Sequence, residues 1–346
     1  MTQPSPDIWT IKRAHEWTRN YLEQKGDEQA RLSTEWLLSH ACGLERIEVY
    51  TQFDKPLSPV ERDRLREGVR RRAEGEPLQY IVGEVGFRHL TLEVRPDVLI
   101  PRPETEILVE LALDRLPAPV EDVQLQVLDL CTGSGCVGLS IAHERLDTRV
   151  IATDISPAAV NLANVNAADT SLADRFHSFR GDLFEFSAGN ESETECVGDS
   201  AHSAGRGAGS EPILRRGRAE HPFAQSSVRG RDEHPHFYSN AYDLIVSNPP
   251  YIPSGAGGMD ALPTEVADHE PHLALDGGGD GLDIARRIIE QAPAFMKKST
   301  YLILELDERN VHAAAEFAVQ LNTYDVVEVE RDLTGRERFV LARRRL

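Results

Sequence analysis

Short apolar runs alternate with amphipathic segments after Pro119, and this alternation limits the possible fold more than any other feature of the sequence. A regular strand–helix order is typical of a parallel, doubly wound α/β sheet. The helices are clearest at Pro157–Ala168 and Gly281–Met296. We expect strands at Val127–Leu130, Val150–Thr153, Asp243–Ser247, Tyr301–Glu305, Asp325–Val329 and Arg338–Ala342.

The last two of these strands are joined by only a short segment, residues 330–337. A parallel crossover needs a dozen residues or more, so these two strands should run antiparallel. A mostly parallel sheet with a terminal antiparallel hairpin is the arrangement of the methyltransferase branch of Rossmann-like folds. The predicted fold class is therefore α/β, with a class I methyltransferase type of sheet.

Residues 1–80 are predicted to form a separate helical domain, because apolar residues recur there at helical spacing. The segment Ser58-Pro59-Val60-Glu61 combines a capping serine, a proline at the first helical position and a glutamate three residues after the cap. The apolar stripes are Ile8, Ile11, Ala14, Trp17 and Tyr21, then Leu32, Trp36, Leu37, Ala41 and Leu44, then Leu65, Val69 and Ala73.

The third helix also carries a run of arginines between residues 62 and 72. Two interpretations remain open for it. The favoured one is a solvated face balanced by Glu61, Asp63 and Glu67, and the other is a docking face for an acidic or RNA-linked partner.

Two further segments complete the expected organisation. Residues 81–100 alternate apolar and polar side chains as in a connecting β-hairpin, and residues 101–346 form the larger α/β domain. Residues 187–240 interrupt that domain with a stretch rich in Gly, Ser, His and Arg, which we expect to be a disordered surface insertion. Its irregularly spaced histidines are expected to be solvated, so we expect no metal site.

The composition narrows the class of function. A formal net charge of −19 makes tight non-specific binding of nucleic acid a poor hypothesis, because such binding depends on Lys and Arg. No apolar run approaches the ~20 residues of a membrane helix, so no membrane span is expected. The four cysteines form no C-x-x-C pair, and the start lacks the features of a secretory signal. We therefore expect a cytoplasmic protein, acting as a monomer.

A glycine-rich turn follows the first strand of the α/β domain. Leu130 leads into Cys131, Thr132, Gly133, Ser134 and Gly135, where the backbone must turn sharply and approach a ligand closely. Asp154 ends the next strand, where an acidic residue typically accepts hydrogen bonds from ribose hydroxyls. Taken alone, this pattern fits a nicotinamide dinucleotide about as well as S-adenosylmethionine.

A second motif, Asn248-Pro249-Pro250-Tyr251, decides between them, because it also follows an apolar strand and can face the same crevice. The Asn248 side-chain oxygen and the Pro249 carbonyl are both acceptors, and the proline ring fixes the backbone. Together they can grip the two hydrogens of an NH₂ group and aim its nitrogen at an electrophile, while the Tyr251 ring stacks on the planar group. The alternative is a simple Asn-Pro turn.

These motifs resemble those of the protein-(glutamine-N5) methyltransferases that modify peptide release factors. The resemblance covers nearly the whole chain outside the insertion, and I-P-R-P-E-T-E is its most specific part, since N-P-P-Y is shared with adenine-N6 methyltransferases. The matching segments are R-L-S-T-E-W-L-L (31–38), G-E-P-L-Q-Y-I-V-G (75–83), L-I-P-R-P-E-T-E (99–106), S-N-P-P-Y-I (247–252), H-E-P (269–271), L-A-L-D-G-G (273–278) and D-L-T-G-R-E-R (332–338).

The resemblance implies an S-adenosylmethionine-dependent enzyme that methylates the glutamine of the Gly-Gly-Gln motif in release factors. It implies that the helical domain contacts the release factor, and that residues 102–105 lie near the cleft. The implied cofactor-binding residues are Cys131, Thr132, Gly133, Ser134, Gly135, Asp154, Asp182, Leu183 and Asn248. The implied substrate-binding residues are Asn248, Pro249, Pro250 and Tyr251, of which Asn248, Pro249 and Tyr251 are catalytic.

Two departures from the family pattern stand out. The family more often has glycine where Cys131 stands, and the insertion replaces a connection of only a few residues. The rival functions are glutamine methylation of a ribosomal protein, adenine-N6 methylation of nucleic acid, an idle cofactor-binding adaptor and a nicotinamide dehydrogenase. The acidic charge argues against adenine, and the intact N-P-P-Y motif argues against an adaptor.

Overall fold

A computed structural model describes residues 8–186, 240–255 and 257–346. Its N-terminal part is helical, as the apolar spacing predicts. The helices are α1 (Ile11–Gln24), α2 (Ala30–Cys42), α3 (Arg46–Thr51), α4 (Pro59–Ala73) and α5 (Leu78–Val82). The predicted start of α4 is confirmed, since the Ser58 side chain accepts from the Glu61 N–H and the Glu61 side chain accepts from the Ser58 N–H.

The helices pack around an apolar core that includes Ile11, Leu22, Leu37, Leu65 and Val69. The first predicted stripe is only partly buried, because Ile8 and Trp17 stay 46% and 47% exposed. Trp17 instead stacks on Tyr21, with ring centroids 5.1 Å apart.

Two arginines of α4 form exposed ion pairs on its surface. Arg66 pairs with Asp63 at 2.7 Å, and Arg70 pairs with Glu67 and Glu74 at 2.6 Å each. These contacts favour the interpretation of a charge-balanced, solvated face. Glu61 does not join them, because it pairs with Lys55 at 3.1 Å.

A short antiparallel hairpin follows α5. It consists of β1 (Glu84–Phe87) and β2 (Leu90–Glu93), with Phe87 paired to Leu90. Phe87, Leu90 and Leu92 are buried on one side of it, as their alternation predicts.

The remaining strands form an eight-stranded sheet in the order β6-β5-β4-β3-β7-β8-β10-β9. Strands β3, β4, β5, β7 and β8 are parallel, and β10 runs antiparallel to both β8 and β9. The predicted fold class, with its terminal antiparallel hairpin, is confirmed. The strands are β3 (Leu125–Leu130), β4 (Thr148–Asp154), β5 (Phe176–Asp182), β6 (Glu185–Phe186), β7 (Tyr242–Ser247), β8 (Met296–Glu305), β9 (Tyr324–Arg331) and β10 (Glu337–Arg344).

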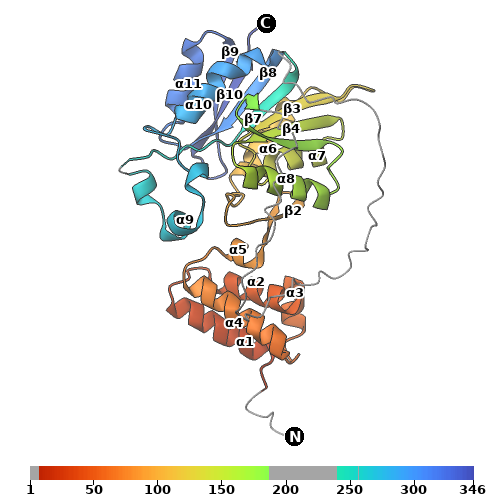
Figure 1. The fold of residues 1–346 in the computed structure, drawn as a ribbon, viewed down its shortest axis with the longest axis vertical. Coiled ribbons are helices and arrows are strands. Elements are labelled where there is room, and N and C mark those ends of the chain that lie inside the picture. The colour runs from red at the N-terminus through yellow and green to blue at the C-terminus, as the bar shows by residue number, and fades with distance from the viewer. Residues whose placement is uncertain (1–7, 187–239, 256) are drawn as a thin grey trace, which may run out of the picture. The chain divides into compact units, whose positions relative to one another are not determined.

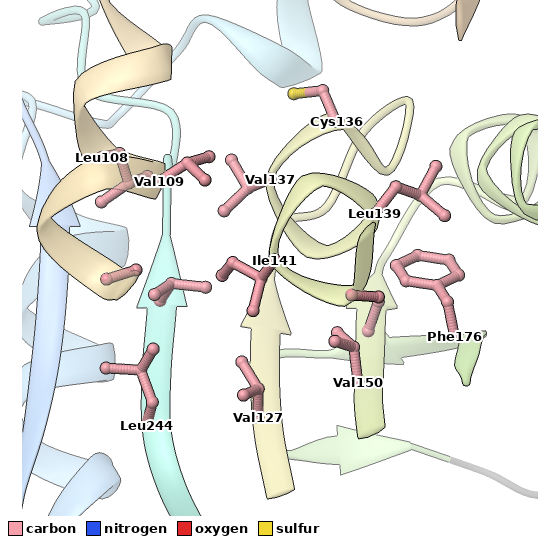
Figure 2. Packing of buried hydrophobic residues seen from close by; sticks show 14 of the residues in the cluster. Leu108, Val109, Val127, Cys136, Val137, Leu139, Ile141, Val150, Phe176 and Leu244 are labelled. Carbon is pink, nitrogen blue, oxygen red and sulfur yellow. The ribbon is translucent and has the colours of Figure 1, made fainter. Parts of the chain in front are cut away.

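Helices cover both faces of this sheet (Figure 1). On one face lie α6 (Thr105–Arg115), α7 (Cys136–Glu144) and α8 (Pro157–Asp169). On the other lie α10 (Asp283–Gln291) and α11 (Val311–Gln320). Figure 2 shows the first layer, where side chains of α6 and α7 pack against those of β3, β4, β5 and β7.

Successive residues of the central strands point to opposite faces of the sheet. Each strand therefore contributes side chains to two apolar cores, one on each face. Val127 of β3 and Val246 of β7 belong to the core under α6, α7 and α8. Leu128 and Ile245, their neighbours in sequence, belong to the core under α10 and α11. This two-sided burial explains why β3 and β7 read as continuous apolar runs.

Two details of the sequence prediction were wrong. The helix expected over residues 281–296 spans only Asp283–Gln291, because Gly281 has φ +80° and Pro293 ends the helix in the 3-10 turn Ala292–Ala294. Met296 therefore belongs to β8. Strand β5 was missed, because it lies towards one edge of the sheet and carries polar residues such as His177 and Arg180.

The segment between β7 and α10 holds α9 (Thr264–His269) and the 3-10 turns Met259–Ala261 and His272–Ala274. The insertion predicted at 187–240 lies, except for Asn240, outside the described residues, as do its histidines. Across the part of the chain that the structure describes, no helix has both the length and the apolar character for a membrane crossing.

Candidate active site

Strands β3 and β7 place the two sequence motifs side by side. The strands are parallel neighbours, and Leu130 pairs with Ser247. The Ser247 hydroxyl also donates to the Leu130 carbonyl at 2.7 Å. Since Cys131 and Asn248 come next in the sequence, the glycine loop and the N-P-P-Y loop both start at the carboxyl edge of the sheet, where α/β proteins bind ligands.

A cavity opens at this edge, and most of the predicted site residues line it. Segments 97–102 and 271–276 supply much of the remaining wall. Three predicted residues, Gly135, Pro249 and Tyr251, are not among the lining residues. The predicted residues that do line the cavity are Cys131, Thr132, Gly133, Ser134, Asp154, Asp182, Leu183, Asn248 and Pro250.

Asp129, the residue of β3 two positions before the glycine loop, fixes this loop by hydrogen bonds. We predicted no role for it from the sequence. The Asp129 carboxylate accepts from the Thr132 hydroxyl at 2.6 Å and from the Gly138 N–H at 3.1 Å. Burial raises the pKa of Asp129 to about 7. The sequence could have indicated this role, because an aspartate inside an apolar strand is buried and needs hydrogen-bond donors nearby.

Asp154, at the end of β4, ties its strand to the glycine loop. Its carboxylate accepts from the Gly133 N–H and from the Ser156 N–H, at 2.9 Å each. Burial raises the pKa of this carboxyl above its ordinary value. A carboxylate has about four acceptor sites, so acceptor capacity remains for a hydroxyl group of a ligand.

Cys131 and Leu183 have backbone conformations that glycine prefers, with φ of +56° and +57°. Cys131 lines the cavity and also packs against the core under α10 and α11. Leu183 is fixed through its carbonyl, which accepts from the Thr153 hydroxyl at 3.1 Å.

Asp182, the neighbour of Leu183 at the cavity, forms an ion pair of 2.9 Å with Arg287 of α10.

The Asn248 side chain has a defined orientation. Its Nδ2 donates to the Thr105 hydroxyl oxygen, at the first residue of α6, at 3.2 Å. With the nitrogen used in this way, Oδ1 is the atom left to accept from a ligand. Thr105 belongs to the I-P-R-P-E-T-E segment, and its contact with Asn248 spans 143 residues of sequence, so no local pattern indicates it.

The rest of the N-P-P-Y loop is packed against a second backbone segment. A Cβ at Gly277 would lie 2.7 Å from the Pro250 carbonyl oxygen, so the two backbones touch and only glycine fits. Ile252 and Asp276 form a parallel bridge, and the Asn310 side chain donates to the Tyr251 carbonyl at 3.1 Å. Burial raises the pKa of the Tyr251 hydroxyl, whose side chain packs against the core under α10 and α11.

Arg102 and Glu270 connect the two segments that complete the cavity wall. The Arg102 guanidinium lies 2.6 Å from Glu270 Oε1, and the Glu270 side chain is 1% exposed. Burial raises the pKa of this carboxyl although Arg102 acts against the shift. The ion pair therefore fixes segment 97–102 against segment 270–276.

Fold and site together define a class. The sheet order, the glycine loop after β3 and the acidic residue at the end of β4 are those of a class I methyltransferase that uses S-adenosylmethionine. The cavity also fits that group. Asp154 offers acceptors for hydroxyls. A Cβ at Gly133 would lie 3.9 Å from Val98, which also lines the cavity, so glycine there leaves space that a side chain would fill.

Comparisons with known proteins agree with this class. Residues 13–83 match the family model "PrmC N-terminal domain", and residues 105–193 match "Methyltransferase small domain". A release factor glutamine methyltransferase of Geobacter sulfurreducens is 40% identical over 301 residues, 87% of this chain and 85% of that protein. One from Rhodopirellula baltica is 34% identical over 98% of both chains.

A further relative, from Bacillus subtilis, is 31% identical over 96% of this chain and 97% of its own length. Identity at this level over nearly the full length of several relatives establishes common descent of both domains. The chain belongs to the release factor glutamine methyltransferase family.

Proposed function

We propose that this protein transfers the methyl group of S-adenosylmethionine to the side-chain amide nitrogen of the glutamine in the Gly-Gly-Gln motif of peptide chain release factors. The observation that carries the proposal is the orientation of Asn248, whose nitrogen is bound to Thr105 so that its oxygen is free for a substrate amide. Because release factors act in translation, we place the reaction in the cytoplasm.

The residues around the glycine loop would hold the cofactor. We assign Cys131, Thr132, Gly133, Ser134 and Gly135 to its methionine end, and Asp154 to its ribose hydroxyls. Asp182 and Leu183 would flank the adenine. When bound, S-adenosylmethionine supplies a methyl group on a positively charged sulfur, which is the electrophile of the reaction.

The N-P-P-Y loop would act by orientation. The nitrogen of a carboxamide is a poor nucleophile because its lone pair is delocalised into the carbonyl group. Asn248 Oδ1 and the Pro249 carbonyl would each accept one of the two amide hydrogens, and the nitrogen would then face the cavity. Alignment of two reactants can lower a barrier by up to ~7–11 kcal/mol. The nitrogen becomes acidic as it gains the methyl group, so no strong general base is required.

Tyr251 has a more specific assignment. Its ring would cover the planar amide by stacking, and this requires the side chain to turn, because here it packs against the core under α10 and α11 and does not line the cavity. The Tyr251 carbonyl is held by Asn310, and Gly277 contacts the loop backbone. The loop is thus fixed independently of the substrate, which is what catalysis by orientation requires.

The test is intact-mass analysis of a release factor after incubation with the protein and S-adenosylmethionine. We expect a gain of one methyl group, mapped by peptide fragmentation to the Gly-Gly-Gln glutamine. Parallel reactions with ribosomal protein and with DNA test the alternative substrates. Methylation of either of those, with an unchanged release factor, would overturn the proposal.

Replacement of Asn248 tests the mechanism. We expect Asn248→Ala to lose at least ~100-fold in kcat, because one of the two acceptors is gone, while calorimetry shows cofactor affinity within about threefold of the wild type. Ser254→Ala, three residues beyond the motif, is the matched control and should keep wild-type turnover. Near-wild-type methylation by Asn248→Ala would contradict the proposed role.

A further inference from the structure

Glu305 is a buried carboxyl group at the active-site edge that the reaction described above does not use. In the register of β7 and β8, Ser247 pairs with Leu304. The next residues are Asn248 and Glu305, so both lie at the carboxyl edge of adjacent parallel strands. Glu305 is only 1% exposed, and its Oε2 has no hydrogen-bond partner among the described residues. A carboxyl buried in this way is costly, and its position calls for a reason.

Thr105 connects the two side chains. Its hydroxyl oxygen accepts from Asn248 Nδ2 at 3.2 Å. The same hydroxyl lies close enough to the Glu305 carboxyl to lower its pKa against the larger effect of burial, so it is the nearest donor that the carboxylate can use. A hydroxyl group has a single hydrogen. When Thr105 gives this hydrogen to the Glu305 carboxylate, it can act only as an acceptor towards Asn248. The Asn248 amide must then turn its NH₂ group to Thr105.

We propose that Glu305 is a positioning residue, which acts through the Thr105 hydroxyl to hold the Asn248 carboxamide with its oxygen facing the substrate amide. This inference rests on the proposed function. The reversed amide would present an NH₂ group to the NH₂ group of the substrate glutamine, two donors facing each other. When Asn248 donates to Thr105 and Thr105 donates to Glu305, the Asn248 carboxamide has the orientation that binds the substrate amide.

The surroundings of Glu305 set its protonation state. Burial raises the pKa of Glu305 to about 7, and Thr105, Arg338 of β10 and Arg102 act against this shift while Glu104 adds to it. Tyr251 also lies close enough for Glu305 to raise the pKa of the tyrosine further. A protonated Glu305 can donate to Thr105, which can then donate to Asn248. Turnover should therefore fall as the pH drops through about 7.

Two substitutions test the proposal. Glu305→Gln places at position 305 an amide that can donate to Thr105 through its NH₂ group as well as accept through its oxygen, so it no longer fixes the direction of the Thr105 hydrogen. Thr105→Val removes the connecting hydroxyl at nearly constant volume. For each variant we expect kcat to fall about 10- to 100-fold, by analogy with the loss seen when a hydrogen-bond partner that orients a metal ligand is removed. The KM for the release factor and the Kd for S-adenosylmethionine should change less than about threefold.

The pH profile and a double variant separate positioning from a merely structural role. In Glu305→Gln, the fall in kcat below pH about 7 should disappear. The double variant should be no slower than the slower single variant, because both changes break the same connection. Thr105→Ser should recover kcat to within about threefold of the wild type. Glu328→Gln, on the exposed surface of β9, is the control and should match the wild type.

Several results would overturn the proposal. One is wild-type kcat in Thr105→Val, which also decides the matter if Glu305→Gln does not fold. Another is multiplied losses in the double variant, or a pH profile that Glu305→Gln leaves unchanged. If the wild-type protein methylates no release factor, the proposed function fails and this inference fails with it. If the wild type is active and both single variants equal it, only this inference fails.

Discussion

Asp129 and Glu305 place two carboxyl groups inside the central sheet, on β3 and β8. Burial raises the pKa of each to about 7. Both groups therefore bind a proton more tightly in the folded chain than in the unfolded chain. Their contribution to the free energy of unfolding is most favourable below the ordinary carboxyl pKa of about 4, and it is lost as the pH rises from there to about 7.

The substitution Asp129→Asn should make this dependence visible. An asparagine oxygen can still accept from Thr132 and Gly138, but it does not ionise. The wild type loses stability as Asp129 ionises between pH 4 and 7, and the variant does not. The stability of the variant relative to the wild type should therefore rise over this range by up to about 4 kcal/mol and then level off. Urea unfolding at several pH values measures this difference in the free energy of unfolding. Asp325→Asn, at an exposed ion pair with Arg343, is the control and should not show this rise. A pH-independent difference for Asp129→Asn would contradict the assignment.

Cys131 is the second residue whose environment leads to a prediction, because of its φ of +56°. This conformation costs an ordinary residue roughly 1–2 kcal/mol, and a β-branched residue more. We expect Cys131→Gly to stay within about 1 kcal/mol of the wild type and Cys131→Val to lose at least about 2 kcal/mol in urea unfolding. Cys42→Val, at the end of α2, serves as the control. Equal stability of the two Cys131 variants would show that backbone strain is not the cause.

At the scale of elements, α7 lies unusually close to the sheet. Gly138 faces β3, β4 and β5, and a Cβ there would lie 2.7 Å from the Phe176 ring and 2.9 Å from both Asp129 Oδ2 and Val150. Figure 2 shows the neighbouring α7 side chains above these strands. Gly138, three residues beyond the glycine-rich turn, therefore serves helix–sheet packing, and this contact positions the start of α7 next to the cavity.

The substitution Gly138→Ala tests that role. We expect it to destabilise the protein by about 1–3 kcal/mol through overpacking, although alanine favours helices. Gly86→Ala in β1 is the matched control, since a Cβ there meets nothing within 4 Å. Thermal unfolding followed by circular dichroism compares the two. A Gly138→Ala variant as stable as Gly86→Ala would show that α7 can move away from the sheet.

Elements also show where sequence reasoning succeeded and where it could not. Strands β3 and β7 were predictable, because burial on both faces demands continuous apolar runs. Strand β5 was not, because its position near the sheet edge permits polar residues. In the site, the ends of β3 and β7 indicated Cys131 and Asn248. The contact of Asn248 with Thr105 depends on how α6 packs on the sheet, which no local spacing encodes.

At the scale of the whole molecule, one arginine connects the helical domain to the segment beside the active site. Arg72 of α4 lies 3.0 Å from Asp27 and 2.9 Å from Glu265 of α9. The Arg72 and Asp27 side chains are 13% and 6% exposed, so this pair differs from the surface pairs along the rest of α4. Its loss would leave the Asp27 carboxylate buried without its main partner.

The substitution Arg72→Met should therefore cost about 3–5 kcal/mol in the free energy of unfolding. Arg66→Met removes an exposed pair on the same helix and should cost about 1 kcal/mol or less. Urea unfolding of both variants measures the contrast. If the two costs were equal, the Arg72 contacts would be no more than another surface ion pair.

The order of the last strands has a consequence for synthesis on the ribosome. Strand β10 lies between β8 and β9, and its Phe339 pairs with Glu305. A nascent chain that ends before residue 337 thus exposes the edge of β8 where Glu305 lies. The active-site edge of the sheet is completed only when β10 has left the exit tunnel. The carboxyl edge of β8 can therefore reach its folded environment only after β10 has been added to the sheet.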